Sequence, residues 1–166
     1  SGLVASVAIA EDDNLLGEYT VNYKKTHSQT LLPMLDEVAR ACVRTGMRGY
    51  LGETLISQPT CDSAQPGGGL EIARRMFDTW RGEALVRPIV APHGTTTCNE
   101  ALLRAGVELA AGQNALFTLH ASEMDYEMKY FAERGETPTR YLKRIGAVNE
   151  RLLAGHCIHL TTDDIE

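Results

Sequence analysis

The sequence has no excess of positive charge and no long apolar run. Its 166 residues contain 16 lysines and arginines against 22 aspartates and glutamates, a formal net charge of −6 at pH 7. A nucleic-acid surface needs a basic face, so we expect no direct contact with nucleic acid. No apolar segment approaches the roughly 20 residues that cross a membrane, and no charged-then-apolar leader opens the chain. We therefore expect a cytoplasmic protein that does not contact a membrane.

The cysteines form no Cys-x-x-Cys pair. They are Cys42, Cys61, Cys98 and Cys157. This spacing predicts neither a zinc knuckle nor a disulfide framework, so we expect reduced, buried thiols. Apolar residues make up 43% and charged residues 23% of the chain, which is ordinary for globular proteins. At this length the composition predicts one compact domain or two very small ones.

The first 46 residues follow a strand, strand, helix pattern. Short β-type runs at 4–10 and 15–22 flank the polar turn at 11–14, which predicts a β-hairpin. From Ser28 onward apolar residues recur at intervals of three and four, which predicts a helix that ends at Gly46. The apolar positions of this helix are Leu31, Leu32, Leu35, Val38, Ala39 and Cys42.

After Gly46 the pattern alternates between strand and helix. Strands are expected at 48–56, 86–91, 115–120 and 152–158, and amphipathic helices at 69–80, 98–111 and 123–145. Such alternation is typical of βαβ units, so the predicted fold class is α/β with a parallel sheet. The glycine run 67–69 lacks the Gly-Lys-Ser/Thr ending of a phosphate loop, and we interpret it as a flexible connector.

Four of the five histidines lie at or just after the end of a predicted strand. His93 follows one strand, His120 ends the next, and His156 and His159 flank the end of the last. Ligands bind at this end of the strands in α/β folds. A single histidine there is more often structural, but three successive strands that each supply one indicate a site.

His120 and Glu123 have a spacing that suits metal-assisted hydrolysis. A neutral imidazole at a strand end can hold a cation that lowers the pKa of a bound water, and a carboxylate three residues later can move protons. The alternative for Glu123 is an ordinary first-turn acid that complements the helix dipole. The spacing alone favours neither interpretation.

Residues from about 38 to 166 resemble the central part of the amidohydrolase superfamily. The matching stretches are MRGYLGETLIS, LVRPIVAPHGTTTCNEALLRAG, LFTLHASEMDYEMKYF and TPTRYLKRIGAVNERLLAGHCIHLTTDDI. They are similar to the aminohydrolase branch, which includes methylthioadenosine/S-adenosylhomocysteine deaminases, guanine deaminases and triazine hydrolases. The resemblance implies about four βα units of a partial TIM-barrel-like sheet. It also implies hydrolytic deamination of a small purine- or triazine-like heterocycle with a divalent metal, zinc or iron.

The resemblance also implies a role for individual residues. His120 matches the metal-binding histidine after the fifth strand, and Glu123 matches the carboxylate that moves protons to the ring. His156 matches the histidine that orients the attacking water, and His93 matches a histidine that contacts substrate. His159 has no clear counterpart, and we interpret it as structural.

The chain departs from the family pattern in several places. The His-x-His pair of the first strand is absent, and the late-strand Asp ligand would lie beyond Glu166. Asp163 and Asp164 follow two threonines and are expected to cap a helix. The family often has Ser-Pro or Ala-Pro where this chain has Gly94-Thr95. Since a complete barrel needs about 250 residues, we expect a fragment or chimera that is weakly active or inactive alone.

A second resemblance covers residues 1–38. The motif Lys24-Lys25-Thr26-His27-Ser28-Gln29 followed by LLPMLDE is similar to the N-terminal lobe of TsaB (YeaZ) type subunits of the tRNA threonylcarbamoyladenosine machinery. It implies an actin-like (ASKHA) hairpin and helix segment at 1–38, joined to the partial barrel at 39–166. Two alternatives to a deaminase fragment therefore stay open. One is a TsaB-like scaffold or interaction protein of tRNA modification, and the other is an engineered protein without natural activity.

A partial barrel leaves sheet edges and one apolar face uncovered. Dimerisation or coverage by the N-terminal hairpin would remove this exposure. We therefore expect a homo-oligomer, and we expect the hairpin to pack against an edge or a face of the βα sheet.

Overall fold

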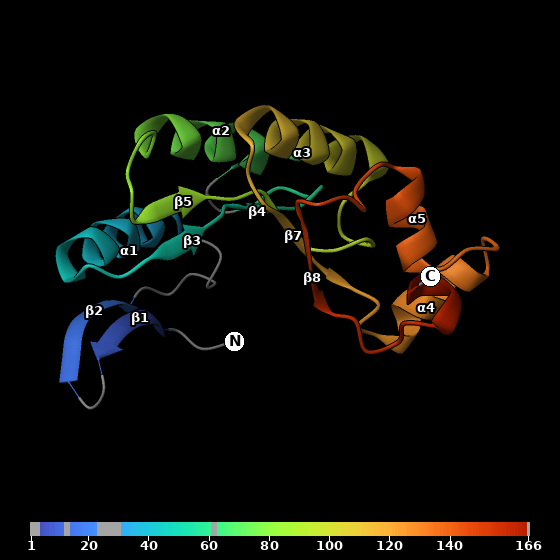
Figure 1. Cartoon of the computed structure of the whole chain (residues 1–166), viewed down its shortest axis with the longest axis horizontal. Helices are drawn as coiled ribbons and strands as arrows, with labels where there is room; N and C mark the ends of the chain where they lie inside the picture. The colour runs from blue at the N-terminus through green and yellow to red at the C-terminus, as the bar shows by residue number, and fades with distance from the viewer. Residues whose placement is uncertain (1–3, 12–13, 23–30, 61–62, 166) are drawn as a thin grey trace.

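The computed structural model describes residues 4–11, 14–22, 31–60 and 63–165. Its first elements are the antiparallel strands β1 (Val4–Glu11) and β2 (Asn14–Asn22), followed by helix α1 (Leu31–Thr45). The predicted hairpin and helix are confirmed, whereas the turn residues 12–13 and the helix start at Ser28 lie outside the described residues. Within the described residues the hairpin strands pair only with each other, and outside the hairpin their main contacts are with α1 (Figure 1). The hairpin therefore packs on α1, contrary to the expectation that it would pack against an edge or a face of the βα sheet.

Four parallel strand segments follow α1, and their order in space is their order in the chain. The ladders join β3 to β5, β4 to β6 and β7 to β8, all parallel, and the bridges Val90–Phe117 and Gly94–His120 connect the second segment to the third. The strands are β3 (Gly49–Leu51), β4 (Thr54–Leu55), β5 (Val86–Pro88), β6 (Ala91–Pro92), β7 (Phe117–Ala121) and β8 (Leu152–His156). This is a mixed α/β fold that corresponds to part of a TIM-barrel-like sheet, as predicted.

The first two strand segments are each split in two, where the sequence pattern predicted single strands. In the second segment Pro88 and Pro92 have no N–H to donate to a ladder, so the pairing is short on either side of Ile89. In the first segment Gly52 packs so closely against the Ile89 carbonyl that a Cβ there would lie 3.0 Å from its oxygen. The two interruptions face each other across the sheet.

The helices alternate with the strands. They are α2 (Gly69–Thr79), α3 (Glu100–Gln113), α4 (Asp125–Ala132), α5 (Pro138–Arg144) and α6 (Thr162–Ile165). The predicted helix at 123–145 is two helices because Gly135 has a φ of +73°, which ends the first. Thr137 then caps the second by accepting the Arg140 N–H, with Pro138 at its first position.

The glycine run 67–69 lies at the start of α2 and has a packing role. A Cβ on Gly69 would lie 2.9 Å from the carbonyl oxygen of Thr54, so only glycine lets the helix begin this close to β4. Gly67 has a φ of +70°, which turns the chain into the helix. The run thus forms the end of the connection from β4 to α2 and the first residue of that helix.

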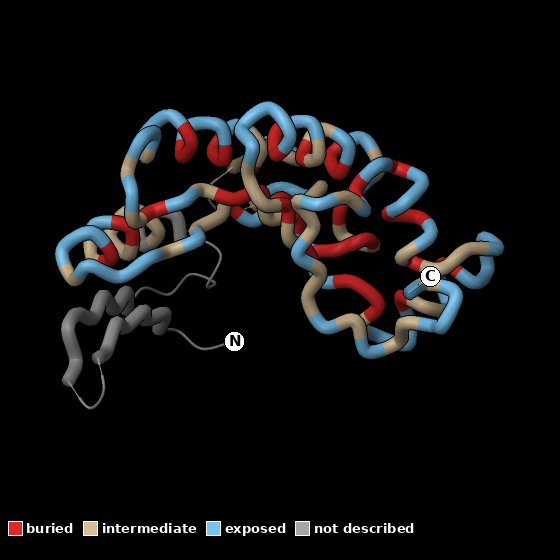
Figure 2. The backbone as a smooth tube through the Cα atoms, viewed as in Figure 1, coloured by how far each residue is buried: buried red, intermediate tan, exposed pale blue. Residues whose placement is uncertain are grey.

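The main core lies between the strands and helices α2, α3 and α5. In β7 the side chains of Phe117, Leu119 and Ala121 are buried, whereas Thr118 and His120 between them are more exposed. Figure 2 shows the buried segments along the strands and on the helix sides that face them. One face of the sheet therefore packs on helices, and the opposite face, which lines the interior of a complete barrel, is open to solvent.

A second, smaller core joins α1 to the first strands. It contains Ala39, Cys42 and Val86, with Trp80 packed against them, and Trp80 Nε1 donates a 3.0 Å hydrogen bond to Asp36 Oδ1. α1 ends as predicted at Gly46, which has a φ of +75°, and the Met47 N–H bonds to the Cys42 carbonyl. Within the described residues, no helix has the length and apolar character needed to cross a membrane.

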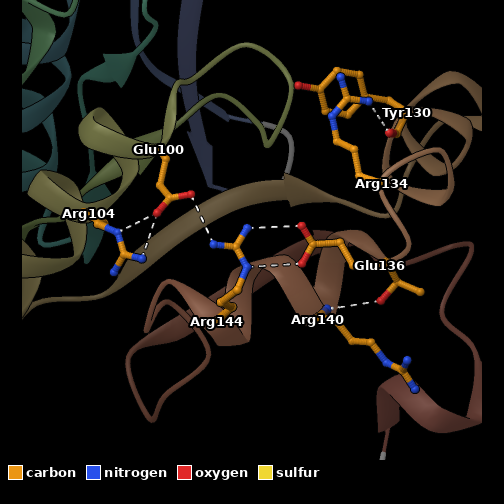
Figure 3. Close-up of polar contacts among 8 residues, drawn as sticks. Glu100, Arg104, Tyr130, Arg134, Glu136, Arg140 and Arg144 are labelled. Carbon is orange, nitrogen blue, oxygen red and sulfur yellow. Dashed lines mark hydrogen bonds and ion pairs between the residues drawn. The ribbon is translucent and has the colours of Figure 1, made fainter.

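An ion-pair network on the surface connects α3 with α5 (Figure 3). Arg144 donates two hydrogen bonds to the Glu136 carboxylate, at 3.1 and 3.3 Å, and a third to Glu100 at 3.3 Å. Glu100 also accepts from Arg104 one turn further along α3. These groups are solvent-exposed, so the network fixes the relative position of the two helices more than it adds stability.

The described cysteines are all free, in agreement with the sequence. Cys42 and Cys98 are buried and Cys157 is half-buried. Burial raises the pKa of the Cys98 thiol above its ordinary value of 9.0, despite hydrogen bonds that act in the opposite direction. This thiol is therefore protonated and unreactive at neutral pH. Cys61 lies outside the described residues.

Candidate metal centre

The predicted site residues meet at the carboxyl ends of three neighbouring strand segments. His120 lies in β7, and the register pairs it with Gly155 and pairs Ala121 with His156 in β8. On the other side of β7, Gly94 bridges to His120, which brings the loop of His93 alongside. The structure therefore collects on one edge the side chains that the sequence placed at three separate strand ends.

His120, Glu123 and His156 form a compact donor cluster. His156 Nε2 lies 2.9 Å from His120 Nδ1 and 3.5 Å from Glu123 Oε1. One ligand atom from each of the three residues lies within 4.8 Å of the other two. The two imidazole rings are tilted by 41° with their centroids 4.9 Å apart. Two imidazoles and a carboxylate match the donor preference of zinc and similar divalent cations.

His93 lies next to this cluster and is held in place by a hydroxyl group. Its ring centroid is 5.2 Å from that of His120 with an edge-on angle of 76°, and its Nδ1 is 2.9 Å from Thr97 Oγ1. Burial lowers the pKa of His93 below its ordinary value of 6.5, and His120 lowers it further, while Glu123 acts in the opposite direction. His93 is therefore a neutral imidazole at neutral pH, able to donate or accept one hydrogen bond.

The backbone at this edge adopts conformations that are uncommon outside glycine. Ser122, which follows β7, has a φ of +49°, and His156 and Cys157 at the end of β8 have φ values of +66° and +56°. Left-handed non-glycine residues cost about 1–3 kcal/mol each, and such residues cluster at active sites and ligand-binding loops. Here two backbone hydrogen bonds hold the strained segments together, from Cys157 N–H to the Ala121 carbonyl and from His159 N–H to the Ser122 carbonyl.

Gly155 lies opposite His120 in the ladder and lets β8 pack closely on β7. A Cβ at this position would lie 3.3 Å from the Leu119 carbonyl oxygen, which is a tight contact, and 3.7 Å from His120 Nδ1, which is ordinary van der Waals contact. The glycine therefore eases the approach of the two strand backbones beside the His120 ring. The sequence alone did not identify this glycine, which the register places opposite His120.

The remaining sequence candidates lie outside the donor cluster. His159 Nε2 is 3.5 Å from Asp125 Oδ1, consistent with the structural interpretation. Asp164 accepts hydrogen bonds from the N–H and the hydroxyl of Thr161, so its predicted capping role is confirmed. Asp163 instead pairs with Arg140 at 3.2 Å.

Two buried polar residues beside the cluster were missed by sequence reasoning. They are Thr95, which follows Gly94 in the His93 loop, and Glu127, in the first turn of α4. A glutamate in the first turn of a helix is an ordinary capping pattern, and Thr95 lies 32 residues away along the chain. The sequence therefore carried no signal that the two side chains meet.

Comparison with known proteins agrees with the amidohydrolase resemblance of the sequence. Residues 18–166 match the family model described as "Amidohydrolase family". The chain is 38% identical over 132 residues to 5-methylthioadenosine/S-adenosylhomocysteine deaminase 1 of Syntrophus aciditrophicus, covering 79% of this chain and 30% of that protein. The chain thus spans about 30% of the length of the curated relatives it matches.

The solved structures show the same fold. An adenosine deaminase from Xanthomonas campestris with bound zinc superposes with a TM-score of 0.73 at 30% identity, covering 79% of this chain and 30% of the other. A guanine deaminase from C. acetobutylicum superposes with a TM-score of 0.70 at 18% identity over 81% of this chain and 34% of the other, which supports the fold alone.

The amidohydrolase resemblance of the sequence is therefore confirmed. The comparisons give no support to the TsaB resemblance of residues 1–38, to a scaffold role in tRNA modification or to an engineered origin. The family match begins at residue 18, inside that segment. The division of the chain at residue 38 stays an untested prediction.

Proposed function

Because this chain belongs to the amidohydrolase family, we propose that it carries part of the active site of a metal-dependent aminohydrolase. The proposed reaction is the hydrolytic removal of an amino group from a small purine-like heterocycle of the adenosine class. The convergence of His120, Glu123 and His156 within 4.8 Å is the observation that supports this proposal most directly. The deaminase names of the relatives support the reaction class.

The metal assignment follows from the donor set. Imidazole nitrogens are common zinc ligands, and His120 presents one at a partly exposed edge with a second imidazole and a carboxylate within 4.8 Å. We assign His120 as the metal ligand, and we assign His156 and Glu123 to the water that would react there. When bound, a divalent cation acts as a Lewis acid and lowers the pKa of its bound water toward neutral pH.

Three residues of the chain have separate roles in the proposed reaction. The Glu123 carboxylate takes a proton from the attacking water at Oε1 or Oε2 and returns it to the leaving amino group, so that a C–O bond forms, the C–N bond breaks and ammonia leaves. His156, 3.5 Å from Glu123 Oε1, orients the water through a hydrogen bond. His93, a neutral imidazole fixed by Thr97, contacts the heterocycle.

Metal binding tests this proposal without depending on turnover. Zinc titration by calorimetry should show binding to the wild-type chain and its loss in His120→Ala. The matched control is His159→Ala, since His159 also follows β8 but lies outside the donor cluster. Equal loss in both variants, or no binding by the wild type, would overturn the metal assignment.

Ammonia release tests the reaction itself. The zinc-loaded chain is incubated with adenosine, 5'-methylthioadenosine and S-adenosylhomocysteine, and guanine serves as the alternative heterocycle. Release from an adenosine-class compound that disappears in Glu123→Gln supports the proposed reaction. If the chain binds zinc but releases ammonia from none of these compounds, it does not catalyse the reaction alone, and only the metal site is supported.

A further inference from the structure

The carboxylate of Glu127 is buried beside the candidate metal centre although the proposed reaction makes no use of it. It is 5% exposed and is one of four buried polar or charged residues in the part of the chain that the structure describes. A buried carboxylate is costly unless it accepts hydrogen bonds that replace its hydration. The hydrogen-bond partners of Glu127 therefore indicate why this carboxylate is buried.

Each oxygen of Glu127 is bonded to a different loop of the site. Oε1 accepts a 2.5 Å hydrogen bond from the Thr95 hydroxyl, in the loop that carries His93. Oε2 accepts a 2.9 Å hydrogen bond from the backbone N–H of Glu123. One carboxylate thus connects the loop after the second strand segment to the loop after β7, and each of these loops carries a proposed site residue.

Helix capping explains only half of this arrangement. The bond to the Glu123 N–H satisfies a free donor at the start of α4, as a capping glutamate does. The bond to Thr95 crosses to another βα loop and has no capping function. The contact with Thr95 therefore needs a reason other than helix capping, and the reason that the structure offers is the connection between the two loops.

We propose that Glu127 is a positioning residue that, together with Thr95, fixes Glu123 and the His93 loop in register with the His120–His156 pair. The inference deepens the proposed function and rests on it for its catalytic meaning. Outer hydrogen bonds hold the groups around a bound metal, and loss of such a partner typically lowers metal affinity or activity by about 10–100-fold.

Three variants and two controls test this role. Glu127→Ala removes both hydrogen bonds, whereas Glu127→Gln retains an acceptor for the Glu123 N–H and an amide that can donate to Thr95 Oγ1. Leu142→Ala, a truncation in the same core, serves as the control for general destabilisation. Thr95→Val removes only the hydroxyl, and its control is Thr45→Val, whose hydroxyl bonds within α1.

The first readout is zinc affinity, measured well below the melting temperature of every variant. We expect Glu127→Ala to weaken zinc binding at least about tenfold, Thr95→Val to weaken it less, and Glu127→Gln to retain most of the affinity. Leu142→Ala and Thr45→Val should bind zinc as the wild type does. A decrease of equal size in Glu127→Ala and Leu142→Ala would overturn the positioning role and leave Glu127 with a structural one.

The second readout uses the metal-free protein and separates this inference from the proposed function. Amide hydrogen exchange of Glu123 should accelerate in Glu127→Ala and Thr95→Val but not in their controls. The imidazole nitrogen resonances of His93, His120 and His156 should shift in the same two variants. If the wild type binds no zinc, the proposed function fails and these measurements decide the positioning role alone. Unchanged exchange and unchanged resonances would overturn it.

Discussion

His120 Nδ1 and His156 Nε2 lie 2.9 Å apart across the β7–β8 ladder, although 36 residues separate them in the chain. The parallel register that pairs Ala121 with His156 sets this distance. Two ring nitrogens this close need a proton or a common cation between them, because two facing lone pairs repel each other. The pair is therefore the part of the site most sensitive to small movements of the strands.

Gly155→Ala should disturb this pair. The added methyl group would lie 3.3 Å from the Leu119 carbonyl oxygen, so the two strands must separate slightly, and it would also contact His120 Nδ1 at 3.7 Å. We expect a loss of about 1 kcal/mol in the free energy of unfolding together with weaker zinc binding. Gly112→Ala is the control, because a Cβ in that exposed helix position has open space. It should stabilise the protein by about 0.5–1 kcal/mol. Equal effects from the two substitutions would contradict the packing argument.

Glu123→Gln should separate function from folding. The Glu123 side chain is about one third exposed, and the hydrogen bond to Glu127 uses its backbone N–H, which the substitution leaves in place. We expect the free energy of unfolding to change by less than about 0.5 kcal/mol. Proton transfer in the proposed reaction should fall by about 10²–10⁴-fold, because an amide cannot accept and return the proton. A large drop in melting temperature relative to Glu133→Gln would show that Glu123 is structural.

Asp164 should make the stability of the C-terminal segment depend on pH. Burial alone would raise the pKa of Asp164, but hydrogen bonds from Thr137 and Thr161 outweigh it and lower the pKa below the ordinary value of 3.8. A lowered pKa means that the stabilisation is complete above pH 3.8 and is lost as the pH falls through the folded-state value.

Asp164→Asn cannot titrate, so its stability deficit against the wild type should be largest near pH 7, at about 1 kcal/mol, and should shrink below pH 3.8. Thermal melts between pH 7 and pH 2.5 measure this difference. Asp163→Asn is the control, because Asp163 is 73% exposed and caps nothing in the described residues. A deficit that does not change with pH would show that the hydrogen bonds of Asp164 do not depend on its charge.

The open face of the sheet predicts self-association. Tyr50 in β3 and Leu153 in β8 are 62% and 56% exposed, and their neighbours along each strand are only partly buried. The outer strands β3 and β8 each have a partner on one side only within the described residues. We propose that a second copy of this chain covers this face. Light scattering should give twice the monomer mass, and Leu153→Lys should reduce it to one monomer while Ile165→Lys does not. A monomeric wild type at all concentrations would contradict this prediction.

Most elements of the fold could be predicted because their apolar periodicity is local. The period of two in β7 and of three to four in α1 follows directly from which side chains are buried. The division of the segment 123–145 had local signals in Gly135 and Thr137-Pro138, but the apolar pattern continues through them. The interruptions of the first two strand segments at Gly52 and Pro88 depend on how these segments pack against each other. The sequence of one strand alone does not determine that packing.

The convergence of the candidate site residues could be predicted from the strand ends. His93, His120 and His156 lie close together because the carboxyl ends of parallel strands share an edge, whatever the details of the loops. The Thr95–Glu127 contact and the left-handed backbone of His156 could not be predicted, because both result from tertiary contacts between loops. Residue type alone gave no indication of either.

Trp80 is the one tryptophan of the chain, and its place in the small core beside α1 makes it an internal optical reporter. Its indole N–H is bonded to Asp36, so release of α1 would move the ring from a packed, hydrogen-bonded setting into water and shift its emission to the red. The histidine edge belongs to β7 and β8, at the other end of the strand order (Figure 1). Trp80 fluorescence therefore reports the release of α1 from the sheet. The NMR resonances of the histidines report changes at the ends of β7 and β8. Recorded on one sample, the two signals show whether the ends of the sheet unfold together.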